Sequence, residues 1–183
     1  AVTGAFVPFN TKTTEGQVIN GSVPCSGAIM RILIDGGEPE LVAWGFRNAY
    51  GLAIHEGKLF VVENGYDERG SRPAWGTGDV LWQVENDQWY GWPDHSGPYE
   101  LSSDLFKVPG KGPTDLLIKE KPNDVPEPVA MLGVHSSSNG MDFSTSEDFG
   151  FRGYAFIAQL GDMSPNVGKV LGPVGFKVVM VDV

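Results

Sequence analysis

Charged and amide side chains gather on either side of one short apolar stretch of the sequence. Arg47 and Asn48 precede this stretch, and Asn64 to Arg69 follow it. An arginine donates two parallel hydrogen bonds to a planar carboxylate, so Arg47 is a candidate anion-binding group. It could equally form a structural ion pair with Glu63 or Asp67, and the sequence leaves both interpretations open.

The second of these segments also offers oxygen atoms to a cation. Gly65 permits close approach of the backbone, and a carbonyl oxygen there would suit Ca²⁺. The simpler interpretation is that Gly65 is a turn residue with positive φ. Asp67, Glu68 and Asp79 are either cation ligands or solvated loop charges, and no EF-hand spacing supports the first alternative.

A third polar segment begins at His135 and continues through three serines to Asn139. His135 has no cysteine or acidic partner in the sequence, which favours a hydrogen-bonded structural role over catalysis. No Gly-x-Ser-x-Gly motif surrounds Ser136 to Ser138, so a serine nucleophile is not expected. The other two histidines, His55 and His95, are interpreted as surface or turn residues.

The apolar stretch between the first two polar segments predicts a β-hairpin. Gly51–Ile54 and Lys58–Glu63 are short runs rich in Val, Leu and Phe, and Glu56-Gly57 between them is typical of a tight turn. In a hairpin, the entry to the first strand and the exit of the second lie at the same end. We therefore expect both polar segments to converge on one face of the protein.

The hairpin sequence recurs later in the chain. Gly51-Leu-Ala-Ile matches Gly140-Met-Asp-Phe, and the run from Lys58 to Gly65 matches that from Tyr154 to Gly161. The repeat predicts a unit that is a four-stranded antiparallel sheet. The unit occurs about twice, and a partial copy precedes the first whole one. The strands predicted outside the hairpin are Ala28–Asp35, Glu40–Gly45, Asp79–Glu85, Pro128–Leu132, Met141–Phe143, Tyr154–Leu160 and Phe176–Asp182.

Four-stranded antiparallel sheets in tandem predict an all-β fold, and specifically a β-propeller. A propeller needs about 4–8 blades to close, so the chain is expected to be a fragment of a longer protein. In a blade, the loop that enters the innermost strand and the loop between the second and third strands share one face. Arg47 and His135 fall in equivalent loops of neighbouring blades, which is the strongest internal argument for a site.

Composition narrows the class of protein. The chain has 183 residues, with 25 glycines and 13 prolines, which suits one turn-rich β-domain. A net charge of −10 argues against nucleic acid and against an anionic membrane surface as partners. No apolar run is long enough for a transmembrane helix, and no signal peptide is visible at Ala1. Cys25 is the only cysteine, which excludes an intrachain disulfide, a CxxCH haem site and a cysteine zinc cluster.

A dense aromatic loop lies between Asn86 and Gly97. Its aromatic side chains either wall a pocket or fix the loop by packing, and packing is the commoner role in propellers. The residues in question are Trp89, Tyr90 and Trp92.

Seven stretches, in order along the chain, resemble the glucose/sorbosone dehydrogenase family. They are PCSGAIMRI, GFRNAYGLAI, ENGYDERGSRP, GDVLWQV, WYGWPDHSG, VHSSSNGMDFS and GFKVVMVDV, spread from Pro24 to Val183. The resemblance implies a six-bladed β-propeller, and many members of the family use pyrroloquinoline quinone (PQQ) and Ca²⁺ to oxidise aldoses. Residues 1–183 would be the C-terminal-side portion of a single propeller domain, about two whole blades plus part of another.

The resemblance also implies roles for particular residues. The implied cofactor-binding residues are Arg47, Asn48, Asn64, His135 and Ser136, and the implied Ca²⁺ ligands are the backbone carbonyls of Gly65 and Tyr66. Arg47 and Asn48 would also face the substrate and act in catalysis, with Arg47 stabilising the reduced quinone oxygen. Tyr66 stands where the glucose dehydrogenases of the family have proline. The general base is a histidine expected upstream of Ala1.

The function implied by the resemblance is oxidation of an aldose or related sugar at C1. Electrons would pass to an external acceptor, and the protein would be periplasmic or secreted. Two alternatives stay open. The first is a non-catalytic propeller that binds carbohydrate or protein. The second is a metal-dependent lactone hydrolase, which needs carboxylate and asparagine ligands that are few in this chain.

Overall fold

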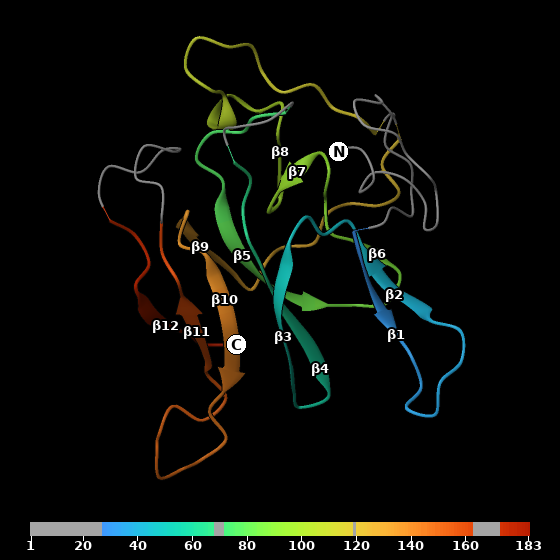
Figure 1. Ribbon diagram of the computed structural model, residues 1–183, viewed down its shortest axis with the longest axis vertical. Coiled ribbons are helices and arrows are strands. Elements are labelled where there is room, and N and C mark those ends of the chain that lie inside the picture. Colours follow the sequence, from blue (N-terminus) through green and yellow to red (C-terminus); the bar gives the residue numbers. More distant parts are fainter. Residues whose placement is uncertain (1–26, 68–71, 119, 163–172) are drawn as a thin grey trace.

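The structure is a computed structural model that describes residues 27–67, 72–118, 120–162 and 173–183 (Figure 1). The described residues form β-strands joined by turns and loops, with one short 3-10 helix at Asp104–Phe106. No helix in these ranges is long and apolar enough to cross a membrane. Glu68, Arg69 and Cys25, which the sequence analysis discussed, lie outside the described residues.

One complete four-stranded antiparallel sheet lies at the centre of the fold, and we call it the first blade. Its strands run in the order β3 (Ala49–His55), β4 (Lys58–Glu63), β5 (Gly78–Val84) and β9 (Ala130–Val134). The turn between β3 and β4 is the expected one, because Glu56 and Gly57 both have positive φ, at 49° and 77°.

A three-stranded antiparallel sheet, which we call the second blade, follows the first blade along the chain. It consists of β10 (Ser138–Phe143), β11 (Ala155–Gln159) and β12 (Lys177–Val181). β10 packs beside β3 and β4 of the first blade. The predicted recurrence of the hairpin is therefore confirmed.

A third sheet precedes the first blade. β1 (Ala28–Arg31) and β2 (Glu40–Trp44) pair antiparallel, and β6 (Gln88–Trp89) adds to β2 in parallel. In the described residues, the four-stranded first blade, the three-stranded second blade and the antiparallel pair of β1 and β2 together correspond to about two blades. A separate two-stranded sheet lies in the loop after β6.

The core lies on both faces of the first blade. Val61 of β4 packs with Trp82 and Tyr90 on one face, whereas Phe60 and Val62 pack against the second blade on the other. This double burial explains why β4 is a nearly continuous apolar run, since a strand covered on both faces loses the alternation of polar and apolar residues. Neighbouring sheets are thus stacked face to face, as blades of a propeller are.

Some expectations differ from the structure. Ile32 to Asp35 was expected to continue the first strand, but β1 ends at Arg31 and Ile34 is fully exposed in the connecting turn. His95 was interpreted as a surface or turn residue. The surface interpretation was wrong, because only 6% of the surface of His95 is exposed, and it lies in β7 (His95–Ser96), which pairs with β8 (Tyr99–Glu100).

The aromatic loop is a packing element, as expected. Trp89, Tyr90 and Trp92 are 0%, 2% and 7% exposed, and Tyr90 stacks on Phe46 with ring centroids 4.5 Å apart. In the same loop, the buried Asp94 accepts hydrogen bonds from the backbone N–H groups of Leu117 and Ile118.

The hairpins of the third sheet, the first blade and the second blade have a common direction. The turns between β1 and β2, between β3 and β4, and between β10 and β11 all point toward the lower end of the view in Figure 1. The loops that lead into β3 and into β10 therefore lie toward the opposite end of the sheets. That end carries the polar segments singled out from the sequence.

Candidate functional site

Arg47 is the central charged group at the loop end of the first blade. Its guanidinium donates from Nη1 to the carbonyl oxygen of Gly65 at 2.6 Å and from Nη2 to Oδ2 of Asp67 at 3.1 Å. The guanidinium carbon also lies 5.4 Å from the centre of the Tyr66 ring. The Arg47 side chain remains 27% exposed and Asp67 47% exposed, so this cation can still be reached from solvent. We call residues 47–48 and 63–67 the site corner.

A chain of amide groups links the site corner to the second blade. Asn48 donates from Nδ2 to Oδ1 of Asn64 at 3.3 Å, and Asn64 donates from its own Nδ2 to the carbonyl oxygen of Ser138 at 2.7 Å. Asn48 is exposed and Asn64 half-buried. The amides therefore form the polar rim on which the two blades meet.

The buried carboxyl of Glu63 holds the Arg47 loop from behind. Its Oε1 accepts the backbone N–H of Arg47, and its Oε2 accepts Nε1 of Trp82 at 2.9 Å. Burial raises the pKa of Glu63 to about 7, and the hydrogen bonds from Arg47 and Trp82 oppose that rise. Glu63 does not pair with the Arg47 guanidinium, so of the two ion pairs considered for Arg47 the structure contains the one with Asp67.

A second buried carboxylate, Asp79, lies at the start of β5. Its Oδ1 accepts the backbone N–H of Gly65 at 3.0 Å. Its Oδ2 accepts the hydroxyl of Ser136 at 2.8 Å and the backbone N–H of Ser138 at 2.7 Å. Only 2% of Asp79 is exposed. The expectation that Asp79 is a cation ligand or a solvated charge was wrong, because its oxygens are occupied by N–H and O–H donors.

The loop before β10 has a strained backbone. His135 and Ser137 both adopt positive φ, at 54° and 51°, a conformation that side chains other than glycine seldom take. His135 is half-buried. The hydroxyls of Ser136 and Ser138 lie 3.0 Å apart, and Ser138 also accepts Nε2 of Gln159 at 3.1 Å. This polar chain fixes the loop against the end of β11.

The predicted convergence of the polar segments is confirmed. The structure joins Arg47, Asn48, Asn64, Gly65, Asp67, Ser136 and Ser138 through the contacts described above. The loops contact one another directly at this face. Hollow space lies behind them, as a cavity of about 10 Å³ next to Asn64, Gly65 and His95, which has room for one water molecule.

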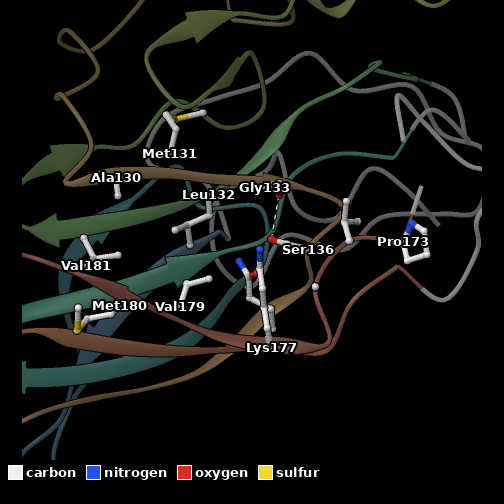
Figure 2. A pocket seen from close by; sticks show the side chains of 13 residues that line it. Ala130, Met131, Leu132, Gly133, Ser136, Pro173, Lys177, Val179, Met180 and Val181 are labelled. Atoms are coloured by element: carbon white, nitrogen blue, oxygen red, sulfur yellow. Dashed lines mark hydrogen bonds between the residues drawn. The ribbon is translucent and has the colours of Figure 1, made fainter. Parts of the chain in front are cut away.

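A larger pocket of about 430 Å³ lies between the outer strand of the first blade and the second blade (Figure 2). Ala130 and Leu132 of β9 and Val179 and Val181 of β12 line it with apolar side chains. Ser136 and Gln159 line this pocket and also belong to the hydrogen-bonded chain that fixes the loop before β10. The pocket is therefore mainly an inter-blade space.

The two carbonyl groups considered for Ca²⁺ already have donors. The Gly65 oxygen accepts the Arg47 guanidinium, and the Tyr66 oxygen accepts the hydroxyl of Thr77 at 3.0 Å. A guanidinium 2.6 Å from the Gly65 oxygen places a positive charge where the ion would lie. No group of three or more His, Cys, Asp or Glu in the described residues could hold a metal ion. In this arrangement the Gly65 turn does not fit Ca²⁺, and its ligand role stays a prediction that requires Arg47 to move.

The same corner does fit a planar anion or a quinone oxygen. The ion pair of Arg47 with Asp67 is partly exposed, so an incoming oxygen could take the place of Asp67 on Nη2, whereas Nη1 is bound to the Gly65 carbonyl. Asn48 and Asn64 place neutral amides beside it. The residues present can therefore bind an oxygen-rich planar ligand through one cation and two amides.

Sequence reasoning missed the two carboxyl groups that hold this corner together. Glu63 was noted only as a possible ion-pair partner, and Asp79 only as a cation ligand or a solvated loop charge. A signal was available, because both residues flank or begin apolar strands that are buried in the fold, where a charged side chain needs several donors.

The sequence of residues 14–167 matches the model of the family "Glucose / Sorbosone dehydrogenase". The match covers more than half of the chain, so the chain belongs to the glucose/sorbosone dehydrogenase family. No curated protein matches it.

Solved structures resemble the chain in fold. One is a calcium structure of a Trichoderma reesei carbohydrate-active enzyme of family AA12, with a TM-score of 0.55, 20% identity and coverage of 78% of this chain and 38% of that chain. Another is the PQQ-bound aldose sugar dehydrogenase from Streptomyces coelicolor, with a TM-score of 0.45, 23% identity and coverage of 82% and 39%. A third is the apo-form of the soluble aldose sugar dehydrogenase from Escherichia coli, with a TM-score of 0.44, 23% identity and coverage of 74% and 36%.

The chain spans less than two fifths of the length of each of these structures. The likeness to the Trichoderma structure agrees with the stacked sheets described above. The predicted fold class, an all-β propeller fragment built of antiparallel blades, is confirmed.

Proposed function

We propose that the protein containing this chain oxidises an aldose or a related sugar at C1, with PQQ as its cofactor, and passes the electrons to an external acceptor. Membership of the glucose/sorbosone dehydrogenase family supports a sugar oxidoreductase. The single observation in the chain that carries the proposal is the partly exposed guanidinium of Arg47, next to Asn48 on a loop whose backbone N–H binds the buried carboxyl of Glu63.

Each residue of the corner has a role in this proposal. Arg47 exchanges Asp67 for an oxygen of the cofactor and stabilises negative charge that develops there. Asn48 and Asn64 orient the ligand through their amide groups. Ser136 and His135 border the site from the second blade. When bound, PQQ supplies a two-electron acceptor for hydride, and the histidine that removes the sugar proton is expected upstream of Ala1.

Calcium belongs to the proposal as an accompanying ion, with Gly65 and Tyr66 as its expected ligands. No catalytic step is assigned to the ion, since the Gly65 carbonyl is occupied by Arg47. A periplasmic or secreted location is likewise part of the proposal, as is a soluble sugar substrate.

The test is turnover of the complete protein with an aldose and an artificial electron acceptor, with and without added PQQ and Ca²⁺. Arg47→Ala is expected to lower turnover by about 10²–10³, because loss of one group that stabilises an oxyanion costs about that much. The same variant should lower the free energy of unfolding by only about 1 kcal/mol, measured by thermal melting.

Arg152→Ala is the matched control. Arg152 also pairs with one carboxylate, that of Glu147 at 2.6 Å, but it is exposed and lies in the turn between β10 and β11. Turnover by the Arg152→Ala variant should equal that of the wild type. If no aldose gives PQQ-dependent turnover, the proposed enzymatic function is overturned, and the alternative of a propeller that binds carbohydrate or protein remains. Full activity of Arg47→Ala would make Arg47 a structural residue.

A further inference from the structure

We propose that Asp79 is a positioning residue that sets the geometry of the candidate site by holding loops of two neighbouring blades at once. One oxygen of its carboxylate binds the Gly65 turn of the first blade, and the other binds the Ser136–Ser138 loop that leads into the second blade. The consequence for cofactor binding rests on the proposed function, whereas the effect on the two loops does not.

Burial of this carboxylate is costly unless the donors around it are well placed. Asp79 is 2% exposed, and the hydrogen bonds it accepts come from two backbone N–H groups and one hydroxyl. Neutral donors can stabilise a buried charge only if they are fixed in direction, because desolvation of an ionised carboxylate costs several kcal/mol. The three donors and the carboxylate therefore fix one another.

The blade architecture does not require a carboxylate at this position. In the second blade, the register of β11 with β12 places Phe176 where the first blade has Asp79. Phe176 is 61% exposed, and the N–H of Gly161, the counterpart of Gly65, is accepted by the carbonyl oxygen of Ser136 instead. A backbone acceptor is thus enough to close such a turn, and the carboxylate of Asp79 must serve the junction itself.

The contacts of Asp79 reach the ligand-facing groups in one further step. The Gly65 peptide, whose N–H binds Asp79, presents its carbonyl oxygen to Arg47. Ser138 donates its backbone N–H to Asp79, and its carbonyl oxygen accepts a hydrogen bond from the side-chain amide of Asn64. The position of one cation and one amide of the site corner therefore depends on the same carboxylate.

The close packing of the Gly65 turn supports this dependence. A Cβ at Gly65 would lie 2.7 Å from the carbonyl oxygen of Thr77 and 2.9 Å from that of Gly78, the residues just before Asp79. The turn cannot shift toward β5 without a clash. It can only move away, and the bond to Asp79 opposes that movement.

The experiment compares Asp79→Asn with Asp94→Asn in the complete protein. Asp94 is also 2% exposed and also accepts backbone N–H groups, but it binds Leu117, Ile118 and Arg72 rather than the loops of the site. Both variants should lose stability. Hydrogen exchange of the Gly65 and Ser138 amides should rise about tenfold or more only in Asp79→Asn, because an N–H bond to a charged acceptor is lost there.

A second readout is the affinity for PQQ, measured by titration of the apo-protein with PQQ alone. Asp79→Asn should weaken it about tenfold relative to Asp94→Asn, and Asp79→Glu should restore part of the loss. Unchanged exchange at Gly65 and Ser138 would overturn the proposal. So would increased exchange with a PQQ affinity equal to that of Asp94→Asn, since Asp79 would then be structural only.

The experiment distinguishes failure of the proposed function from failure of the proposal that Asp79 holds both loops. If the wild type does not bind PQQ, the proposed function falls, and the exchange data alone decide whether Asp79 holds both loops. If Asp79→Asn does not fold, Ser136→Ala replaces it, because it removes one donor on the side of the second blade only. Exchange should then rise at Ser138 and stay unchanged at Gly65, and any other pattern overturns the proposal.

Discussion

The site corner of the first blade and the corresponding corner of the second blade share one backbone. The pairing of β3 with β4 shifts register between Ala49 and Gly51, and that of β10 with β11 shifts between Ser138 and Gly140. The N–H of Asn64 donates to the carbonyl oxygen of Asn48 at 3.1 Å, and in the second blade Leu160 donates to Ser137 at 2.9 Å. The repeat is therefore structural down to single hydrogen bonds.

The side chains on this shared backbone differ in kind. The pairs of equivalent residues, first blade before second, are Arg47 and Ser136, Glu63 and Gln159, Asn64 and Leu160, and Asp79 and Phe176. The charged or amide groups of the first blade are replaced by neutral or apolar ones in the second. Because the second corner folds without them, the polar groups of the first corner are not needed to build a blade, and this is why the first corner is the better candidate for a site.

The largest effect that separates the corners is expected at Glu63 and Gln159. Glu63→Ala leaves the backbone N–H of Arg47 and the indole N–H of Trp82 without acceptors in a buried place. Each buried donor without a partner costs about 1–3 kcal/mol, so unfolding should become easier by roughly 4 kcal/mol. Gln159→Ala loses one bond, to the Ser138 hydroxyl, and should cost about 1 kcal/mol.

Denaturant unfolding at pH 5 measures both variants, since Glu63 is then mostly protonated in the folded state. The mutations lie at equivalent positions on equivalent strands, so each serves as the control for the other. Equal losses in the free energy of unfolding would show that the two corners are energetically alike, and the first corner would then not be the better candidate for a site.

The second expectation concerns pH. Burial raises the pKa of Glu63 from 4.5 to about 7. The folded state therefore binds this proton more tightly than the unfolded state does. The resulting stabilisation is fully present below about pH 4.5 and is lost as the pH rises through 7, a difference of about 3 kcal/mol at most.

Melting curves of the wild type and Glu63→Gln between pH 5 and pH 8 test this expectation. A glutamine does not titrate, so the wild type should lose stability relative to the variant as the pH rises. The difference in stability between the wild type and the Gln159→Ala variant should stay constant from pH 5 to pH 8, because the amide of Gln159 does not titrate. A constant difference for Glu63→Gln as well would place Glu63 in a more polar environment than its burial indicates.

The elements that carry the site follow from local sequence. The Glu56-Gly57 turn, the short β-branched runs and their recurrence fix the hairpin and its partner sheet, and the convergence of Arg47 with Asn64 follows from hairpin geometry alone. Such features are short-range, because they depend on residues that are neighbours in one or two strands. That is why the main strands of the blades could be predicted from sequence.

Contacts between residues far apart in the chain could not be predicted in the same way. Asp79 binds Ser136 across 57 positions and Asn64 binds Ser138 across 74, and no pattern in either segment encodes its partner. The burial of His95 and the parallel addition of β6 to β2 also depend on how the aromatic loop folds back on the first sheet. The direct contact between the loops has the same origin, since these long-range hydrogen bonds hold the loops together.

The smallest expected effect comes from exchanging the residues that follow the two equivalent strands. Asn64→Leu gives the site corner the residue of the second corner and removes the 2.7 Å bond from Nδ2 to the carbonyl oxygen of Ser138. Ser138 is 0% exposed, so water does not replace this donor, and the loss should be about 1–2 kcal/mol. Leu160→Asn makes the reverse change at a residue that is 56% exposed, and it should alter stability by less than about 0.5 kcal/mol.

The value of this exchange lies in its asymmetry. Asn64 bridges two blades, whereas the side chain of Leu160 is mostly solvated. Exchanging asparagine and leucine should therefore change the free energy of unfolding at the first corner and hardly change it at the second. Chemical denaturation of both single variants and of the double variant measures the two costs and their sum. If Leu160→Asn costs as much as Asn64→Leu, the polarity of these positions reflects the strand end itself, and Asn64 has no special part in joining the blades.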